Sequence, residues 1–86
     1  MHTAELLDAA QATAQRLGYR IRHEWLGGSG GGACRIGQQK WIFIDLGLST
    51  LEQLEQVLDA LRQDPALGQV PLLPELERVV QGRRAA

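Results

Sequence analysis

Five of the ten glycines in this 86-residue chain fall in one short loop, shortly before the single cysteine. The loop residues are Gly27, Gly28, Ser29, Gly30, Gly31 and Gly32. Consecutive backbone N–H groups in such a loop can converge on an anion, because glycine adopts backbone angles that other residues avoid. The loop is therefore a candidate ligand site, with Arg22 and Arg35 as supporting charges. Its alternative role is a hairpin tip or a place of close backbone approach.

The thiol of Cys34 is the second group that could carry chemistry. Positive surroundings from Arg35 and a nearby His23 would favour a nucleophilic or redox-sensing thiolate. In the simpler interpretation, Cys34 packs as a small buried hydrophobic side chain and His23 lies in a core or an interface. A lone cysteine cannot form an internal disulfide, and with two histidines it does not complete a four-ligand zinc site.

No catalytic arrangement accompanies these groups. The sequence lacks the phosphate-loop pattern in which glycines are followed by lysine and serine or threonine. Asp45 has no second carboxylate placed beside it for acid–base chemistry, and we expect it to be a strand-end residue that bonds the turn at Gly47. The sequence therefore favours a protein that is not an enzyme and that holds no cofactor or metal.

Composition places the chain among small globular domains. Hydrophobic residues make up 44% and charged residues 22% of the sequence, and the net charge is −1. A dedicated nucleic-acid-binding domain is usually strongly basic, so this balance argues against one. No apolar run approaches the ~20 residues that span a membrane, and the first residues lack the features of a secretory signal. We expect a cytoplasmic location and no membrane partner.

The spacing of apolar residues predicts the elements that position these groups. The predicted helices are 3–17, 49–63 and 74–81, the predicted strands are 19–26, 33–37 and 40–46, and residues 83–86 are a frayed tail. Thr3 is the expected N-cap of the first helix, and Ser49 with Glu52 forms a capping box for the second.

The expected fold class is α+β, in one domain of residues 1–86 with the order α-β-β-β-α-α. The simplest topology is a three-stranded antiparallel meander with the helices packed mainly on one face. A hairpin across the glycine loop would set Trp25 opposite Cys34, and Glu24 opposite Arg35 as a favourable charge pair.

Trp41 and Phe43 lie on the third strand, but the sequence does not fix the face they occupy. A two- or four-residue turn before this strand places them on the face of Cys34, whereas a three-residue turn places them with Arg22 and Arg35. The second arrangement would make an aromatic and basic surface suited to stacking bases or holding a partner peptide.

The stretch from Gly18 to Leu61, about half of the chain, resembles a group of short bacterial proteins with no assigned activity. The shared pattern begins with a glycine-rich hairpin loop (residues 26–32) and a Cys-Arg pair (34–35). It continues with an apolar strand ending in aspartate (41–46) and an acidic leucine helix (52–54). The resemblance supports the fold unit and implies no mechanism.

Residues 44–47 also look like the first strand of RNase H-like and actin-like ATPases, where the aspartate binds metal. Those folds need a larger sheet with further carboxylates.

The leading functional hypothesis is a small non-catalytic adaptor domain that acts through protein contacts, as a homodimer or an assembly subunit. It rests on a third strand that is apolar on both faces in a chain too short to cover both. Trp25, Trp41 and Phe43 are the candidate interface residues. The alternative is nucleic-acid, nucleotide or anion binding through the glycine loop and the basic sheet face, and the third hypothesis is a thiol-dependent redox role of Cys34.

Overall fold

The computed structural model describes residues 1–28 and 30–82. The predicted loop residue Ser29 and the predicted tail of residues 83–86 lie outside the described residues. The elements in chain order are α1 (Thr3–Arg16), β1 (Tyr19–Glu24), β2 (Gly32–Ile36), β3 (Gln39–Asp45), α2 (Thr50–Gln63), the 3-10 helix η1 (Pro65–Gln69) and α3 (Pro74–Gly82). The expected α+β class and element order are confirmed, with η1 as an additional turn in the proline-rich link.

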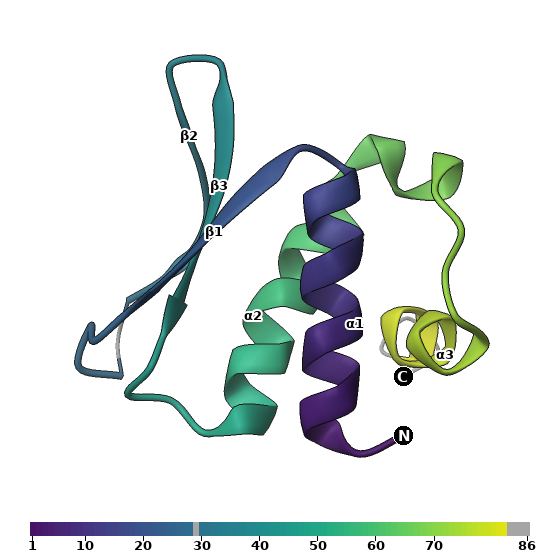
Figure 1. Ribbon diagram of the computed structural model, residues 1–86, viewed down its shortest axis with the longest axis horizontal. Coiled ribbons are helices and arrows are strands. Elements are labelled where there is room, and N and C mark those ends of the chain that lie inside the picture. The colour runs from purple at the N-terminus through teal and green to yellow at the C-terminus, as the bar shows by residue number, and fades with distance from the viewer. Residues whose placement is uncertain (29, 83–86) are drawn as a thin grey trace.

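The elements form layers (Figure 1). The sheet lies on one side, α1 and α2 cover one of its faces, and α3 packs on the far side of these helices. The core lies between the sheet and the helix pair, and its fully buried side chains include Ile42 and Ile44 of β3 and Leu58 and Leu61 of α2. The expectation that the helices pack mainly on one face is therefore confirmed.

The helix ends follow local sequence signals. Ser49 Oγ accepts a hydrogen bond from the N–H of Glu52 (3.2 Å), and the Glu52 carboxylate accepts one from the N–H of Ser49 (3.0 Å), so the predicted capping box is present. His2, and not Thr3, occupies the N-cap position of α1. None of the helices in the described ranges is long and apolar enough to cross a membrane.

The sheet is mixed, and the predicted antiparallel meander is wrong. The strand order is β1-β3-β2, with β1 parallel to β3 and β2 antiparallel to β3. Because β1 and β2 lie at opposite edges, the expected pairs of Trp25 with Cys34 and of Glu24 with Arg35 do not form. The physical reason is the apolar run of β3, which is best shielded from water in the centre of the sheet.

The turn between β2 and β3 decides the side on which the aromatic residues lie. It has two residues, Gly37 and Gln38, because Ile36 and Gln39 are partners in the hairpin. Trp41 is thereby in register with Cys34, on the face opposite to the buried Ile42. The first of the two alternatives that the sequence left open is therefore the observed one.

Two leucines of α2 offer a matched test of this packing, because Leu58 is 1% exposed and Leu51 is 58% exposed. We expect Leu58→Ala to lower the free energy of unfolding by about 2–5 kcal/mol, because it leaves a cavity in the core. Leu51→Ala should lower it by less than about 0.5 kcal/mol. Urea unfolding followed by tryptophan fluorescence measures both values, and equal effects would contradict the packing of α2 on the sheet.

Candidate functional site

The glycine loop connects β1 to β2 by crossing the end of β3. Since β1 and β2 flank β3, the loop must span two strand spacings, about 10 Å. A two-residue turn cannot cover that distance, because such a turn joins neighbouring strands. The length of the loop is therefore a requirement of the strand order.

The carboxylate of Asp45, the last residue of β3, holds this crossing loop. The N–H of Leu26 donates to Oδ1 of Asp45 (3.0 Å), and the N–H of Gly30 donates to Oδ2 (3.4 Å). The N–H of Gly47 also donates to Oδ1 (2.8 Å), which confirms the predicted bond to that turn. The anion that the loop amides contact is thus a buried side chain of the protein itself.

Two opposing effects set the pKa of Asp45. Burial raises the pKa, whereas hydrogen bonds from the backbones of Gly47, Leu26, Gly30 and Gly28 lower it. The hydrogen bonds outweigh burial, so the pKa lies below the usual aspartate value. The carboxylate is therefore ionised at neutral pH and accepts hydrogen bonds from the loop N–H groups of Leu26 and Gly30.

The carboxylate of Asp45, which the resemblance of residues 44–47 would place at a metal-binding strand end, contacts backbone groups in this structure. Both carboxylate oxygens of Asp45 accept backbone N–H groups. Among residues 1–28 and 30–82, no three His, Cys, Asp or Glu side chains gather where they could hold a metal ion. The aspartate stabilises the chain crossing instead.

The side-chain amide of Gln56 joins the loop, the sheet and α2. Its Nε2 donates to the carbonyl oxygen of Gly30 (2.8 Å), and its Oε1 accepts from the N–H of Asp45 (3.2 Å). Sequence reasoning missed Gln56, because the helical pattern of α2 does not indicate which polar residue meets the loop. Only the strand order places the loop within its reach.

Close approach at the crossing requires glycine at two positions. A Cβ at Gly31, where φ is +99°, would lie 2.7 Å from the carbonyl oxygen of Phe43 and 2.5 Å from Nε2 of Gln56. A Cβ at Gly47 would lie 2.9 Å from the backbone nitrogen of Gly28. The glycine-rich composition therefore serves a tight backbone crossing, which is one of the roles that the sequence allowed.

The structure does not bring the two predicted supporting arginines together. Arg22 is in register with Phe43 and forms an ion pair with Glu24 (2.9 Å). Arg35 is in register with Lys40, which lies on the same face as the buried Ile42. The side chain of Arg35 therefore lies on the face that the helices cover, and that of Arg22 on the other. The two arginines lie on opposite faces, so they form no common anion site with the loop amides that the structure describes.

Cys34 and His23 are also separated. Cys34 lies on β2 in register with Trp41, whereas His23 lies on β1, at the other edge, in register with Ile44. The two side chains therefore point to opposite faces. Cys34 is an exposed free thiol, so the expectation of a small buried side chain is wrong, because the helices cover the other face.

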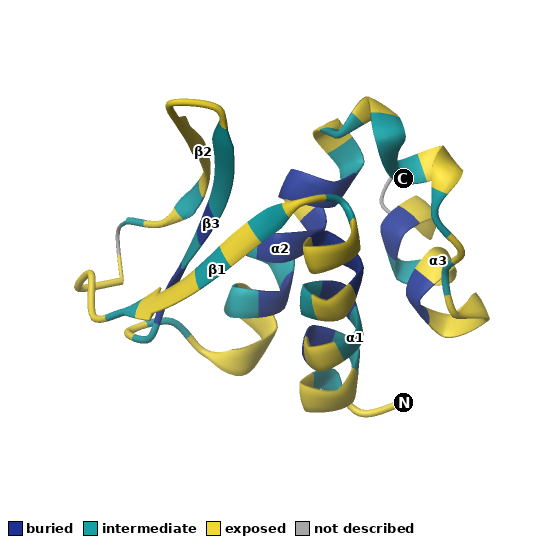
Figure 2. Cartoon of the chain, turned by 45° about the horizontal axis from the view of Figure 1, so that its top comes forward, coloured by how far each residue is buried: buried dark blue, intermediate teal, exposed yellow. Residues whose placement is uncertain are grey.

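The face of the sheet turned away from the helices, called the open face below, carries the remaining candidates. Its strand residues are Arg20, Arg22 and Glu24 from β1, Gly32, Cys34 and Ile36 from β2, and Gln39, Trp41 and Phe43 from β3. The rings of Trp41 and Phe43 stack with centroids 5.9 Å apart and planes 18° apart. The Arg20 guanidinium lies 5.8 Å from the Trp41 ring centroid. Figure 2 shows the exposed positions along β1 and β2.

A cluster of ionisable side chains that sequence reasoning missed joins the sheet to the end of α2. Lys40 Nζ lies 2.9 Å from Oδ2 of Asp64 and 4.5 Å from the ring centroid of Tyr19. Burial and a hydrogen bond to Asp64 raise the pKa of Tyr19 to about 12. Burial alone would raise the pKa of Asp64, but hydrogen bonds from Ala66, Lys40 and Tyr19 lower it. A neutral phenol beside an ion pair is a structural arrangement rather than an acid–base pair.

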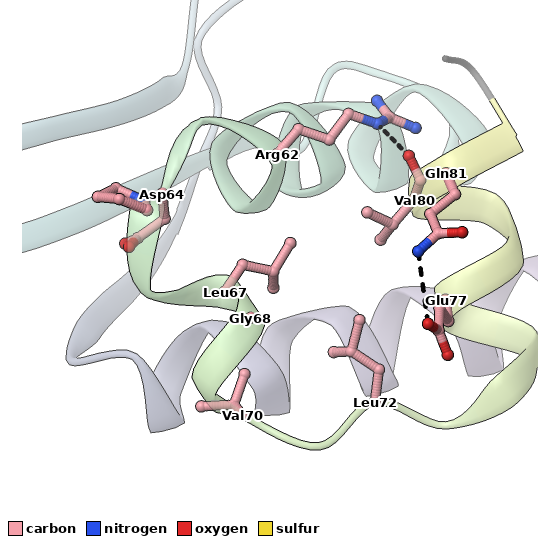
Figure 3. Close-up of a pocket in the computed structure, with 10 residues that line it drawn as sticks. Arg62, Asp64, Leu67, Gly68, Val70, Leu72, Glu77, Val80 and Gln81 are labelled. Carbon is pink, nitrogen blue, oxygen red and sulfur yellow. Dashed lines mark hydrogen bonds between the residues drawn. The ribbon is translucent and has the colours of Figure 1, made fainter. Parts of the chain in front are cut away.

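A cavity of about 450 Å³ lies between the end of α2, η1 and α3 (Figure 3). On its wall, Arg62 donates to the carbonyl oxygens of Val80 (2.8 Å) and Val79 (2.8 Å). Gln81 Nε2 donates to Oε1 of Glu77 (3.4 Å). Arg62 thus satisfies carbonyl groups at the end of α3 and joins α2 to α3, whereas the bond between Gln81 and Glu77 lies within α3.

The Asp45 contacts predict how stability depends on pH. Because folding lowers the pKa of Asp45, the ionised carboxylate stabilises the fold above the ordinary value of 3.8, and this contribution is lost as the pH falls through the lower folded value. We expect Asp45→Asn to lower the urea midpoint at pH 7 and to reduce its fall in acid. Asp8→Asn, at an exposed site on α1, is the control and should change neither quantity. A wild-type midpoint for Asp45→Asn at pH 7 would contradict the role of the carboxylate.

Gly31 and Gly68 test whether the loop needs glycine. A Cβ at Gly68 would meet nothing within 4 Å, in contrast to Gly31. We expect Gly31→Ala to lower the free energy of unfolding by more than about 1 kcal/mol, and Gly68→Ala to change it by less than that amount. Thermal and urea unfolding measure both. A neutral Gly31→Ala would show that the crossing is loose.

In comparisons with protein-family models, with curated proteins and with solved structures, nothing matches this chain. The resemblance to a group of short bacterial proteins therefore stays a prediction.

Proposed function

We propose that this protein is a non-catalytic interaction domain that forms a homodimer through its open face. The observation that carries the proposal is the stacked pair of Trp41 and Phe43 on a face that no helix of the described chain covers. The opposite side of the same strand presents Ile42 and Ile44, which are fully buried. A central strand that is apolar on both sides but covered on one favours a partner on the other.

The charges of the open face suit a second copy of the same face. Arg22 and Glu24 lie on the same side of β1, with their charged groups 2.9 Å apart. In a two-fold symmetric contact each surface meets its own copy, so a contact of Arg22 with Glu24 across the interface would occur twice and pair opposite charges. This ion pair also leaves the face only weakly basic, which favours a protein partner over a phosphate backbone.

The size of the open face sets the expected strength of the dimer. Its strands have six, five and seven residues, and three strands of this length cover about 15 Å by about 20 Å. Trp25 and Leu26, which follow β1, are 77% and 38% exposed, but they lie outside the strand and are not counted in this area. A contact of this size belongs to the small, transient class, and the dimer should dissociate on dilution.

Ile36→Lys tests the proposal, with Leu73→Lys as the matched control. Both residues are large aliphatic side chains that are exposed, 57% for Ile36 and 51% for Leu73, but only Ile36 lies on the open face. We expect Ile36→Lys to raise the dimer dissociation constant by about tenfold or more, because it places a charge in an apolar contact. Leu73→Lys should leave the constant unchanged. Sedimentation across a dilution series measures it, and a constant monomer mass for the wild type would contradict the proposal.

Single-stranded nucleic-acid binding is the second candidate function, and one observation favours it. Arg20 lies over the Trp41 ring on the face that also carries Arg22. Aromatic platforms flanked by arginine are typical of surfaces that stack bases. Tryptophan fluorescence of a dilute monomer, titrated with a single-stranded oligonucleotide, separates the candidates. Quenching that weakens steeply with salt supports nucleic-acid binding, and an unchanged signal excludes it.

A further inference from the structure

A groove runs between the outer edge of β2 and helix α2. Cavities of about 390, 340 and 150 Å³ lie along it. The first two share Ala33, Ala60 and Gln63, and the first and third share Ala33 and Arg35. The shared residues place the three cavities next to one another along β2, and together they are called the groove. Its two sides are β2 and α2, and at one end its lining also includes Tyr19 of β1 and Lys40 of β3. Helix α2 is fixed by its packing on the core.

The backbone of β2 is available on the outer side of the groove. In the ranges that the structure describes, β2 pairs with β3 alone. The two-residue turn makes Ile36 and Gln39 the first hydrogen-bonded pair, and the pattern then alternates along the ladder. The N–H and C=O groups of Ala33 and Arg35 therefore point outward. Such an edge is a template for a further strand.

The side chains along the groove indicate what that strand carries. Ala33 and Ala60 line the middle, and their small size leaves room for an apolar side chain from a ligand. At one end, Lys40 is already paired with Asp64 at 2.9 Å. At the other end, Asp59 is paired with Arg62 at 3.1 Å. Arg35 belongs to none of the ion pairs in the described part of the chain, so its guanidinium is the cation that remains for a carboxylate.

We propose that this groove binds an extended peptide segment of a partner protein, which adds to β2 as a fourth strand and places an acidic side chain against Arg35. Backbone hydrogen bonds with Ala33 and Arg35 would supply affinity, and the alternate side chains that enter the groove would supply specificity. β2 has five residues and spans about 17 Å, so a peptide segment of similar length fills the groove.

This site is distinct from the open face. The side chains of Ala33 and Arg35 line the groove beside α2, whereas Cys34 and Ile36 alternate to the open face. A dimer that uses the open face leaves the groove accessible, so the inference does not depend on self-association. The domain would then have one surface for its own copy and another for a partner.

A displayed library of short random peptides is the probe, because the partner is unidentified. We expect the selected peptides to share an aspartate or glutamate close to an apolar residue. In titrations followed by nuclear magnetic resonance, they should shift the amide signals of Ala33, Arg35 and Ala60. The N–H groups of Ala33 and Arg35 should also become protected from exchange with solvent.

Arg35→Glu and Arg16→Glu form a charge-matched pair of variants, because Arg16 lies in the last turn of α1 and is not a groove residue. Arg35→Glu should weaken peptide binding by about tenfold or more, and Arg16→Glu by less than about twofold. Ala33→Pro removes an outward N–H without removing a bond to β3, and it should abolish binding. All three should dimerise at the wild-type concentration, which separates this test from that of the open face.

Three results would overturn the proposal. The first is that no peptide is selected above background, and the second is that Arg35→Glu binds the selected peptides as tightly as the wild type. The third is protection of Ala33 and Arg35 that rises with protein concentration in the absence of peptide. That result would assign the edge of β2 to a second copy of this chain.

Discussion

The contact between the loop amides and the buried Asp45 carboxylate is the constraint on which the rest of the structure depends. A parallel strand pair usually needs a long helical crossover, but here the chain passes from β1 to β2 and returns along β3. The loop must therefore lie across the end of β3, where its N–H groups would lack partners without an acceptor. Asp45 accepts from Leu26 and Gly30 at that point, and Gln56 extends the same contacts to α2.

The features that could be predicted from the sequence are the local ones. Ser49 and Glu52 mark a helix start because their bonds involve neighbouring residues. The strand order could not be predicted, because the glycine loop has the composition of a hairpin and no local signal says which strand lies beside β1. The apolar run of β3 was the available indication, since a strand shielded on both faces belongs in the centre. The role of Gln56, and the separation of Cys34 from His23, follow from that order alone.

Helix α2 connects the features that matter for interaction. Its apolar side covers β3, so that the aromatic residues of that strand must lie on the other face. Its polar side provides Gln56 to the crossing loop and Gln63 to the groove beside β2. The open face and the groove are thus both defined by where this one helix lies on the sheet.

The N-terminal amine of Met1 contacts the carboxylate of Glu75 at 2.6 Å, which places the start of the chain against α3. In Figure 1 the N-terminal end of the chain and α3 lie beyond α1, on the side of the molecule away from the sheet. A fluorescent protein, an affinity tag or a second domain joined to the N-terminal amine would therefore leave from the side of the molecule opposite the sheet. Attachment there would keep both the open face and the edge of β2 exposed, so the domain can be tethered to a surface or to another chain without obstruction of either.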